Sequence, residues 1–212
     1  MTLKSVIFDF DGTIGDTLPL CLEALRAAIE PLAGRPYSDK EIFACFGPSD
    51  EGAVKRLLPE RWEEALSSYL RCYEKLHDRY PAPFPGMRDL LLHLKERGLL
   101  LTIVTGKGPV SCDISLRRYG ISELFDAIET GSPLGPNKPE GIRALLTRFH
   151  LTPPEVIYVG DATSDVTAAH ETGIRIAAAA WASTADRKKL EAAGPDFLCP
   201  SVTDLAKLLE TL

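Results

Sequence analysis

From Gly86 onward, the chain alternates stripes of apolar residues at helical spacing with short, mostly apolar runs. The runs occupy residues 99–104, 127–129, 156–159 and 174–179, and a further run, 6–8, lies near the N-terminus. Short apolar runs that alternate with helices are typical of strands in a mainly parallel sheet, which helices cover on both faces. The pattern therefore predicts an α/β fold built on such a sheet.

The segment between the first run and Gly86 has a different character. Residues 15–81 contain no convincing strand, and their apolar side chains recur every three or four positions over 18–32 and again over 62–76. Three prolines close this segment and form a stiff connection to the rest: Pro81, Pro83 and Pro85. We predict a core of residues 1–14 and 82–212, interrupted after its first strand by a helical insert of residues 15–81.

Composition narrows the class of protein. The 212 residues carry a net charge of −6 and no basic tract, so nucleic acid is not an expected partner. No stretch of about 20 apolar residues could span a membrane, and the N-terminal apolar run ends too early for a secretory signal. Five scattered cysteines without a C-x-x-C pair favour buried thiols in a reducing compartment over a zinc or disulfide site. We therefore expect a cytoplasmic protein, either a monomer or a homodimer.

Polar residues stand where the predicted strands end. They are Asp9 and Asp11 after the first strand, Thr105 and Gly106 after the run 99–104, Asp161 and Asp165 after the run 156–159, and Lys138 at the start of a helix that leads to the same edge. Because ligands bind at the carboxyl ends of the strands in open parallel sheets, we expect these residues to form one site.

The chemistry of this site follows from its charges. Several carboxylates in one pocket repel one another unless a cation lies between them, and oxygen ligands without His or Cys favour Mg²⁺. Such an ion, together with Lys138, would hold a phosphate close to an anionic nucleophile. A carboxylate such as Asp9 can attack phosphorus, and a second acid two residues later can protonate the leaving oxygen and then activate water.

The same residues resemble the four signature motifs of the haloacid dehalogenase-like hydrolase superfamily, in their order and spacing. The matching segments are Asp9-Phe-Asp11-Gly-Thr13, the strand that ends in Thr105, Lys138-Pro139, and Gly160-Asp161-x-x-x-Asp165. The insert resembles the helical cap of that superfamily, and Phe84-Pro-Gly86 resembles the return to the core in the phosphoglycolate phosphatase-like branch. This resemblance implies a Rossmann-like core with a cap.

It also implies a role for each motif residue. Asp9 is expected to be the nucleophile and a metal ligand, and Asp11 the general acid and base, binding metal through its backbone carbonyl. Thr105 and the backbone N–H of Gly106 are expected to bind the phosphoryl oxygens, and Lys138 to neutralise them. An acid at position 11 favours phosphoryl transfer, since a halide leaving group needs no proton.

The last motif completes the expected metal site. Asp161 is expected to bind Mg²⁺, and Asp165 to support that site. The chain departs from the family pattern in having Gly106 where Ser or Asn is frequent, and Gly141 where a second proline is frequent.

Outside the motifs, the sequence leaves more than one interpretation open. Residues 46–52 resemble the cap loop that contacts substrate, with Gly47 and either Lys55 or Arg56 as candidate contacts. An interhelical turn followed by solvated charges fits equally well. Lys107 is expected at the surface.

The leading hypothesis is a Mg²⁺-dependent phosphatase that acts on a small phosphorylated metabolite, either a phosphoglycolate-like acid or a sugar phosphate. A sugar-phosphate mutase would use the same aspartyl-phosphate, although such enzymes tend to carry an Arg soon after the glycine that Gly47 matches. A non-catalytic phospho-switch of the receiver type would place its acceptor after the third strand and would lack the insert.

Overall fold

The computed structural model describes residues 2–212, in which one six-stranded sheet has the order β3-β2-β1-β4-β5-β6 with every neighbouring pair parallel. The strands are β1 (Ser5–Phe8), β2 (Leu100–Val104), β3 (Ala127–Glu129), β4 (Val156–Gly160), β5 (Arg175–Ala179) and β6 (Phe197–Cys199). Phe8 is in register with Ile103 on one side and Val159 on the other, so β1, β2 and β4 end together. The predicted Rossmann-like parallel fold is confirmed.

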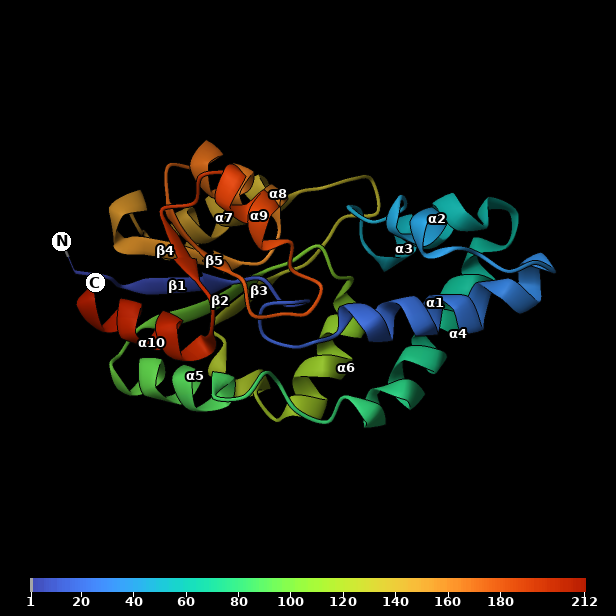
Figure 1. Cartoon of the computed structure of the whole chain (residues 1–212), viewed down its shortest axis with the longest axis horizontal. Helices are drawn as coiled ribbons and strands as arrows, with labels where there is room; N and C mark the ends of the chain where they lie inside the picture. Colours follow the sequence, from blue (N-terminus) through green and yellow to red (C-terminus); the bar gives the residue numbers. More distant parts are fainter. Residues whose placement is uncertain (1) are drawn as a thin grey trace.

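Helices cover both faces of this sheet (Figure 1). One face carries α5 (Met87–Glu96), α6 (Pro109–Tyr119) and α10 (Val202–Thr211), and the other carries α7 (Lys138–Arg148), α8 (Thr163–Glu171) and α9 (Arg187–Ala192). Successive strand residues point to opposite faces, so Phe8 lies in one apolar cluster and Ile7 in the other. Burial on both sides explains why β1 and β4 are apolar almost throughout.

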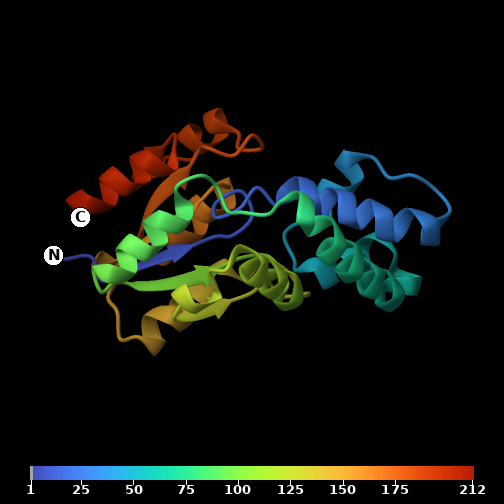
Figure 2. The same cartoon turned by 90° about the horizontal axis from the view of Figure 1, so that it is seen from below.

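Four further helices lie to one side of the sheet, beyond the carboxyl ends of its central strands (Figures 1 and 2). They are α1 (Leu18–Ala33), α2 (Asp39–Phe43), α3 (Asp50–Leu57) and α4 (Trp62–Leu76), and we call residues 18–76 the helical unit. Leu25 and Ile29 of α1 share an apolar cluster with Tyr69 and Tyr73 of α4. The chain enters and leaves this unit at one place, where the Phe84 N–H donates to the Ile14 carbonyl at 2.9 Å.

Short elements complete the chain. In the described part of the chain, four 3₁₀ turns cover Pro59–Arg61, His77–Arg79, Ser122–Leu124 and Pro153–Glu155. No helix within residues 2–212 combines the length and apolar character needed to cross a bilayer.

The structure contains three elements that the sequence pattern did not predict. Strand β6 has only three residues, and α9 has six residues with one buried apolar side chain, Leu190, so neither shows a periodic pattern. Helix α3 begins at Asp50, inside the stretch 46–52 that we interpreted as a loop. The proposed division into residues 1–14, 82–212 and 15–81 stays a prediction, and its first residue lies outside the described part of the chain.

Candidate active site

Asp9 follows directly after β1, and its side chain is buried at the carboxyl edge of the sheet. Its carboxylate accepts the Phe10 N–H at 2.7 Å, which fixes its direction. The chain then turns at Gly12, whose φ of 78° lies in the left-handed region, and a Cβ at this position would collide with the Asp161 carboxylate. Only glycine satisfies both conditions, which explains the glycine of the first motif.

Lys138 joins two carboxylates that are far apart in the sequence. Its Nζ lies 2.8 Å from Asp9 Oδ2 and also forms an ion pair with Asp165. Asp165 is completely buried and additionally accepts the Tyr158 hydroxyl at 3.1 Å and the Ala162 N–H at 3.0 Å. Asp165 therefore sits behind Lys138 at the start of α8 and holds the ammonium beside Asp9.

The ionisation of this group reflects burial and crowding. The pKa of Asp9 is raised from 3.8 to about 6, chiefly by burial, which outweighs the opposing charge of Lys138 and is reinforced by the charges of Asp165 and Asp11. Burial, followed by the charges of Asp9 and Asp165, raises the pKa of Asp161 well above its ordinary value. Burial by itself lowers the pKa of Lys138, but Asp165 and Asp9 outweigh it and hold that pKa above its ordinary value, so the ammonium stays charged.

These acids suit a hard divalent cation. Single carboxylate oxygens of Asp9, Asp161 and Asp165 all lie within 4.8 Å of one another. The donors are oxygen atoms, and the ammonium of Lys138, which pairs with Asp9 and Asp165, offsets only part of the negative charge of the three carboxylates. The residues present therefore fit Mg²⁺.

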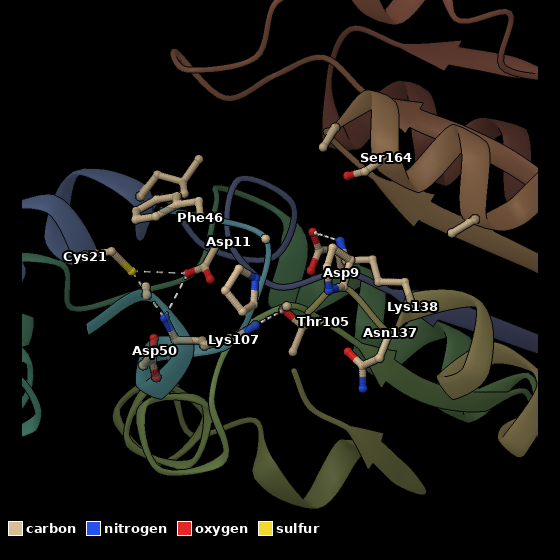
Figure 3. Close-up of a pocket in the computed structure, with 18 of the residues that line it drawn as sticks. Asp9, Asp11, Cys21, Phe46, Asp50, Thr105, Lys107, Asn137, Lys138 and Ser164 are labelled. Carbon is tan, nitrogen blue, oxygen red and sulfur yellow. Dashed lines mark hydrogen bonds and ion pairs between the residues drawn. The ribbon is translucent and has the colours of Figure 1, made fainter. Parts of the chain in front are cut away.

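The carboxylate of Asp11 lies apart from this cluster. It accepts a hydrogen bond from Lys107 Nζ at 3.0 Å (Figure 3). It also accepts a hydrogen bond from the Thr17 hydroxyl. The Lys107 side chain is completely buried, and its Nζ lies 3.5 Å from the Cys21 sulfur and 4.4 Å from the centre of the Tyr73 ring.

Our expectation that Lys107 lies at the surface is therefore wrong. The ion pair with Asp11 and the face of the Tyr73 ring compensate the ammonium for its lost hydration. Burial lowers the pKa of Lys107, but the charge of Asp11 outweighs it and raises the pKa well above its ordinary value. The position of Lys107, two residues after a strand that ends at the site edge, is the sequence signal that could have identified it.

Asp50 connects the helical unit to the core. As the first residue of α3, it accepts the Ser111 hydroxyl and the Gly108 N–H at the start of α6, the latter at 3.2 Å. It also accepts the Tyr69 hydroxyl at 3.2 Å. Burial raises the pKa of Asp50, with Lys107 opposing. The interpretation of this stretch as a turn followed by solvated charges is thus wrong for Asp50.

A cavity of about 720 Å³ opens between the helical unit and the carboxyl edge of the sheet, and Figure 3 shows the site within it. Thr105, Gly106 and Gly47 line the cavity, together with Asp9, Asp11, Asp161 and Lys138. Thr105 is buried, and its hydroxyl accepts the Lys107 N–H at 3.2 Å. Asp165 lies behind the cavity wall, and Arg56 is exposed and does not line the cavity.

Comparison with known proteins relates this chain to phosphatases. The family model described as haloacid dehalogenase-like hydrolase matches residues 6–179. The chain is 32% identical to a phosphoglycolate phosphatase of Synechococcus elongatus over 99% of both proteins. It is 28% identical to the pyrophosphatase PpaX of Halalkalibacterium halodurans, over 99% of this chain and 98% of that protein. The solved structure of a haloacid dehalogenase-like family hydrolase from Streptococcus pneumoniae matches with a TM-score of 0.78, 27% identity and 99% coverage of both chains.

Proposed function

Since this chain belongs to the haloacid dehalogenase-like hydrolases and is a phosphatase of that family, we propose that it hydrolyses a small phosphorylated metabolite with Mg²⁺ through an aspartyl-phosphate on Asp9. The observation that carries this proposal is the position of the Asp9 carboxylate. It is buried between Lys138 and Asp161, at the carboxyl ends of β1, β2 and β4. A carboxylate in this position is a nucleophile with a fixed cation beside it.

In the proposed first step, an Asp9 oxygen bonds to phosphorus while the ester P–O bond breaks. The leaving oxygen takes a proton from Asp11, which carries the second carboxylate of the same loop. In the second step, water gives a proton back to Asp11, its oxygen bonds to phosphorus, and the bond to Asp9 breaks, which releases inorganic phosphate.

Lys138 serves both steps electrostatically. Its ammonium, held in place by Asp165, lies against Asp9 and would neutralise negative charge on the phosphoryl oxygens. Thr105 and Gly106 also line the cavity, and the Thr105 hydroxyl and the Gly106 N–H would donate hydrogen bonds to the same oxygens.

The metal would be held by Asp9 and Asp161, with the backbone carbonyl of Asp11 as a third ligand. When bound, Mg²⁺ supplies the positive charge that lets an anionic phosphate approach an anionic carboxylate. Asp165 forms an ion pair with Lys138 and is therefore proposed to support the metal ligands without binding the metal itself.

We further assign residues 15–81 as a cap over the site. The support is the position of the helical unit at the cavity and its attachment to the core through Asp50. A cap limits the access of bulk water to the acyl-phosphate. All five cysteines are free thiols, which supports a cytoplasmic location.

The test is a phosphate-release screen over small phosphomonoesters with Mg²⁺, repeated with EDTA in place of the metal. Asp9→Asn is expected to lower kcat by at least about three orders of magnitude because it removes the nucleophile. Asp11→Asn is expected to accumulate a phosphoenzyme that turns over slowly.

Other outcomes would contradict the proposal. Substantial turnover by Asp9→Asn would exclude the covalent route. An isomerised sugar phosphate as the main product would identify a mutase, and phosphorylation of Asp9 without repeated phosphate release would identify a switch.

A further inference from the structure

The charges that line the cavity are strongly unbalanced. Its acidic side chains are Asp9, Asp11, Asp50, Glu140, Asp161 and Glu171. The basic side chains that line it, within residues 2–212, are Lys107 and Lys138, and each is already paired with a carboxylate of the site. The positive charges of these two lysines and of one divalent cation would neutralise the six carboxylates only in part. Both lysines and the cation would already be engaged with Asp9 or Asp11.

The side of the cavity that the helical unit forms is mainly apolar, and we call it the apolar wall. It is formed by Leu18, Leu25, Phe43, Phe46, Pro48 and Ala53. Phe43 is 43% exposed and meets the Phe46 ring edge to face, with ring centres 5.4 Å apart and an angle of 72°. Solvent-exposed phenyl rings inside a cavity gain free energy when an apolar or aromatic group covers them.

Four cations of the helical unit that are close in sequence to this wall do not line the cavity: Arg26, Lys40, Lys55 and Arg56. Arg26 forms an ion pair with Asp39. Lys55 forms an ion pair with Glu51 and lies over the Trp62 ring. Arg56 is exposed and outside the cavity. A carboxylate or a second phosphate on the leaving group would therefore lose its hydration and meet carbon and like charge, which is unfavourable without a paired cation.

We propose that the substrate of this site is the phosphate monoester of an uncharged alcohol with an apolar or aromatic face, so that the transferred phosphate is its only anionic group. This inference rests on the proposed phosphatase function and specifies the substrate class. The substrates named in the relatives above, phosphoglycolate and pyrophosphate, each carry a second anionic group. Phosphoglycolate-like acids, which the sequence left open as the substrate class, are on this proposal expected to be the poorer substrates.

The test compares kcat/KM for substrates that differ in that second charge. Phosphoglycolate is paired with its amide, carbamoylmethyl phosphate, which has nearly the same size and no carboxylate. Benzyl phosphate, also an ester of an alkyl alcohol, adds an aromatic face. We expect carbamoylmethyl phosphate to exceed phosphoglycolate by at least tenfold, and benzyl phosphate to exceed both phosphoglycolate and pyrophosphate by at least as much.

Two variants test the wall itself. Phe46→Ala is expected to lower kcat/KM for benzyl phosphate at least about tenfold while leaving methyl phosphate, which does not reach the wall, within about twofold. Phe43→Arg is expected to raise the ratio of phosphoglycolate to benzyl phosphate turnover at least tenfold. Leu134→Ala, which removes an apolar side chain that is 94% exposed and lies outside the cavity, is the matched control with no change in either ratio.

The outcomes separate the two proposals. If phosphoglycolate or pyrophosphate is the better substrate, or if Phe43→Arg leaves the ratio unchanged, the inference about substrate class is overturned and the phosphatase function stands. If no phosphomonoester in the panel releases phosphate with Mg²⁺, the proposed function fails and the inference fails with it.

Discussion

Replacing Asp9 with asparagine should make the metal-free protein more stable while it abolishes turnover. Burial, reinforced by Asp165, raises the pKa of Asp9 from 3.8 to about 6. The folded state therefore holds this proton more tightly than the unfolded chain, so the ionised carboxylate destabilises the fold. The cost is absent below pH 3.8, grows as the pH rises, and is complete above pH 6. A shift of this size corresponds to about 3 kcal/mol.

Urea unfolding in EDTA measures this cost directly. At pH 8, Asp9→Asn is expected to raise the free energy of unfolding by about 3 kcal/mol, and at pH 4.5 by about 1 kcal/mol. Asp113→Asn, which neutralises an exposed carboxylate on α6, is the control and is expected to stay within about 0.5 kcal/mol. Saturating Mg²⁺ should stabilise the wild type more than Asp9→Asn, because the variant lacks one anionic ligand.

The pH dependence of the stability difference shows whether the charge of Asp9 or its packing causes it. If Asp9→Asn is no more stable than the wild type at pH 8 in EDTA, burial does not hold the Asp9 carboxylate at a cost. A gain that is equal at both pH values would point to packing instead of charge.

Three further substitutions test the rest of the site. Lys107→Met removes the buried cation that holds the Asp11 carboxylate in place. Since Asp11 is the proposed general acid and base, and such a group contributes about 10²–10⁴-fold to the rate, we expect kcat to fall at least about tenfold in phosphate-release assays. Asp50→Ala leaves the Ser111 hydroxyl and a backbone N–H unpaired at the junction with the helical unit, so we expect a loss of about 1–3 kcal/mol in urea unfolding, and wild-type stability would show that this contact does not hold the unit. Gly12→Ala introduces a side chain at positive φ against a metal-site carboxylate, so we expect stability to fall by more than about 1 kcal/mol and the apparent Mg²⁺ affinity, measured by calorimetry, to fall with it.

Local sequence pattern was sufficient to predict the parallel sheet apart from β6, and the meeting of acidic side chains at its carboxyl edge. The apolar runs that became β1, β2, β4 and β5 are buried on both faces, which leaves an apolar signal that can be read without knowledge of their partners. Strands that are parallel must end at one edge, so residues placed directly after them, such as Asp9 and Asp161, come together whatever the details of packing.

Tertiary structure alone decided what surrounds that site. Lys107 is buried because a segment 96 positions earlier supplies Asp11 as its partner. Asp50 is half-buried against the core because residues 58 and 61 positions later, at the start of α6, donate hydrogen bonds to it. The apolar wall at Phe43 and Phe46 likewise exists only through the docking of the helical unit. Local periodicity indicates which face of an element is buried, but it does not indicate which distant charge or ring will contact that face. Here those contacts form the lining of the cavity beside Asp9.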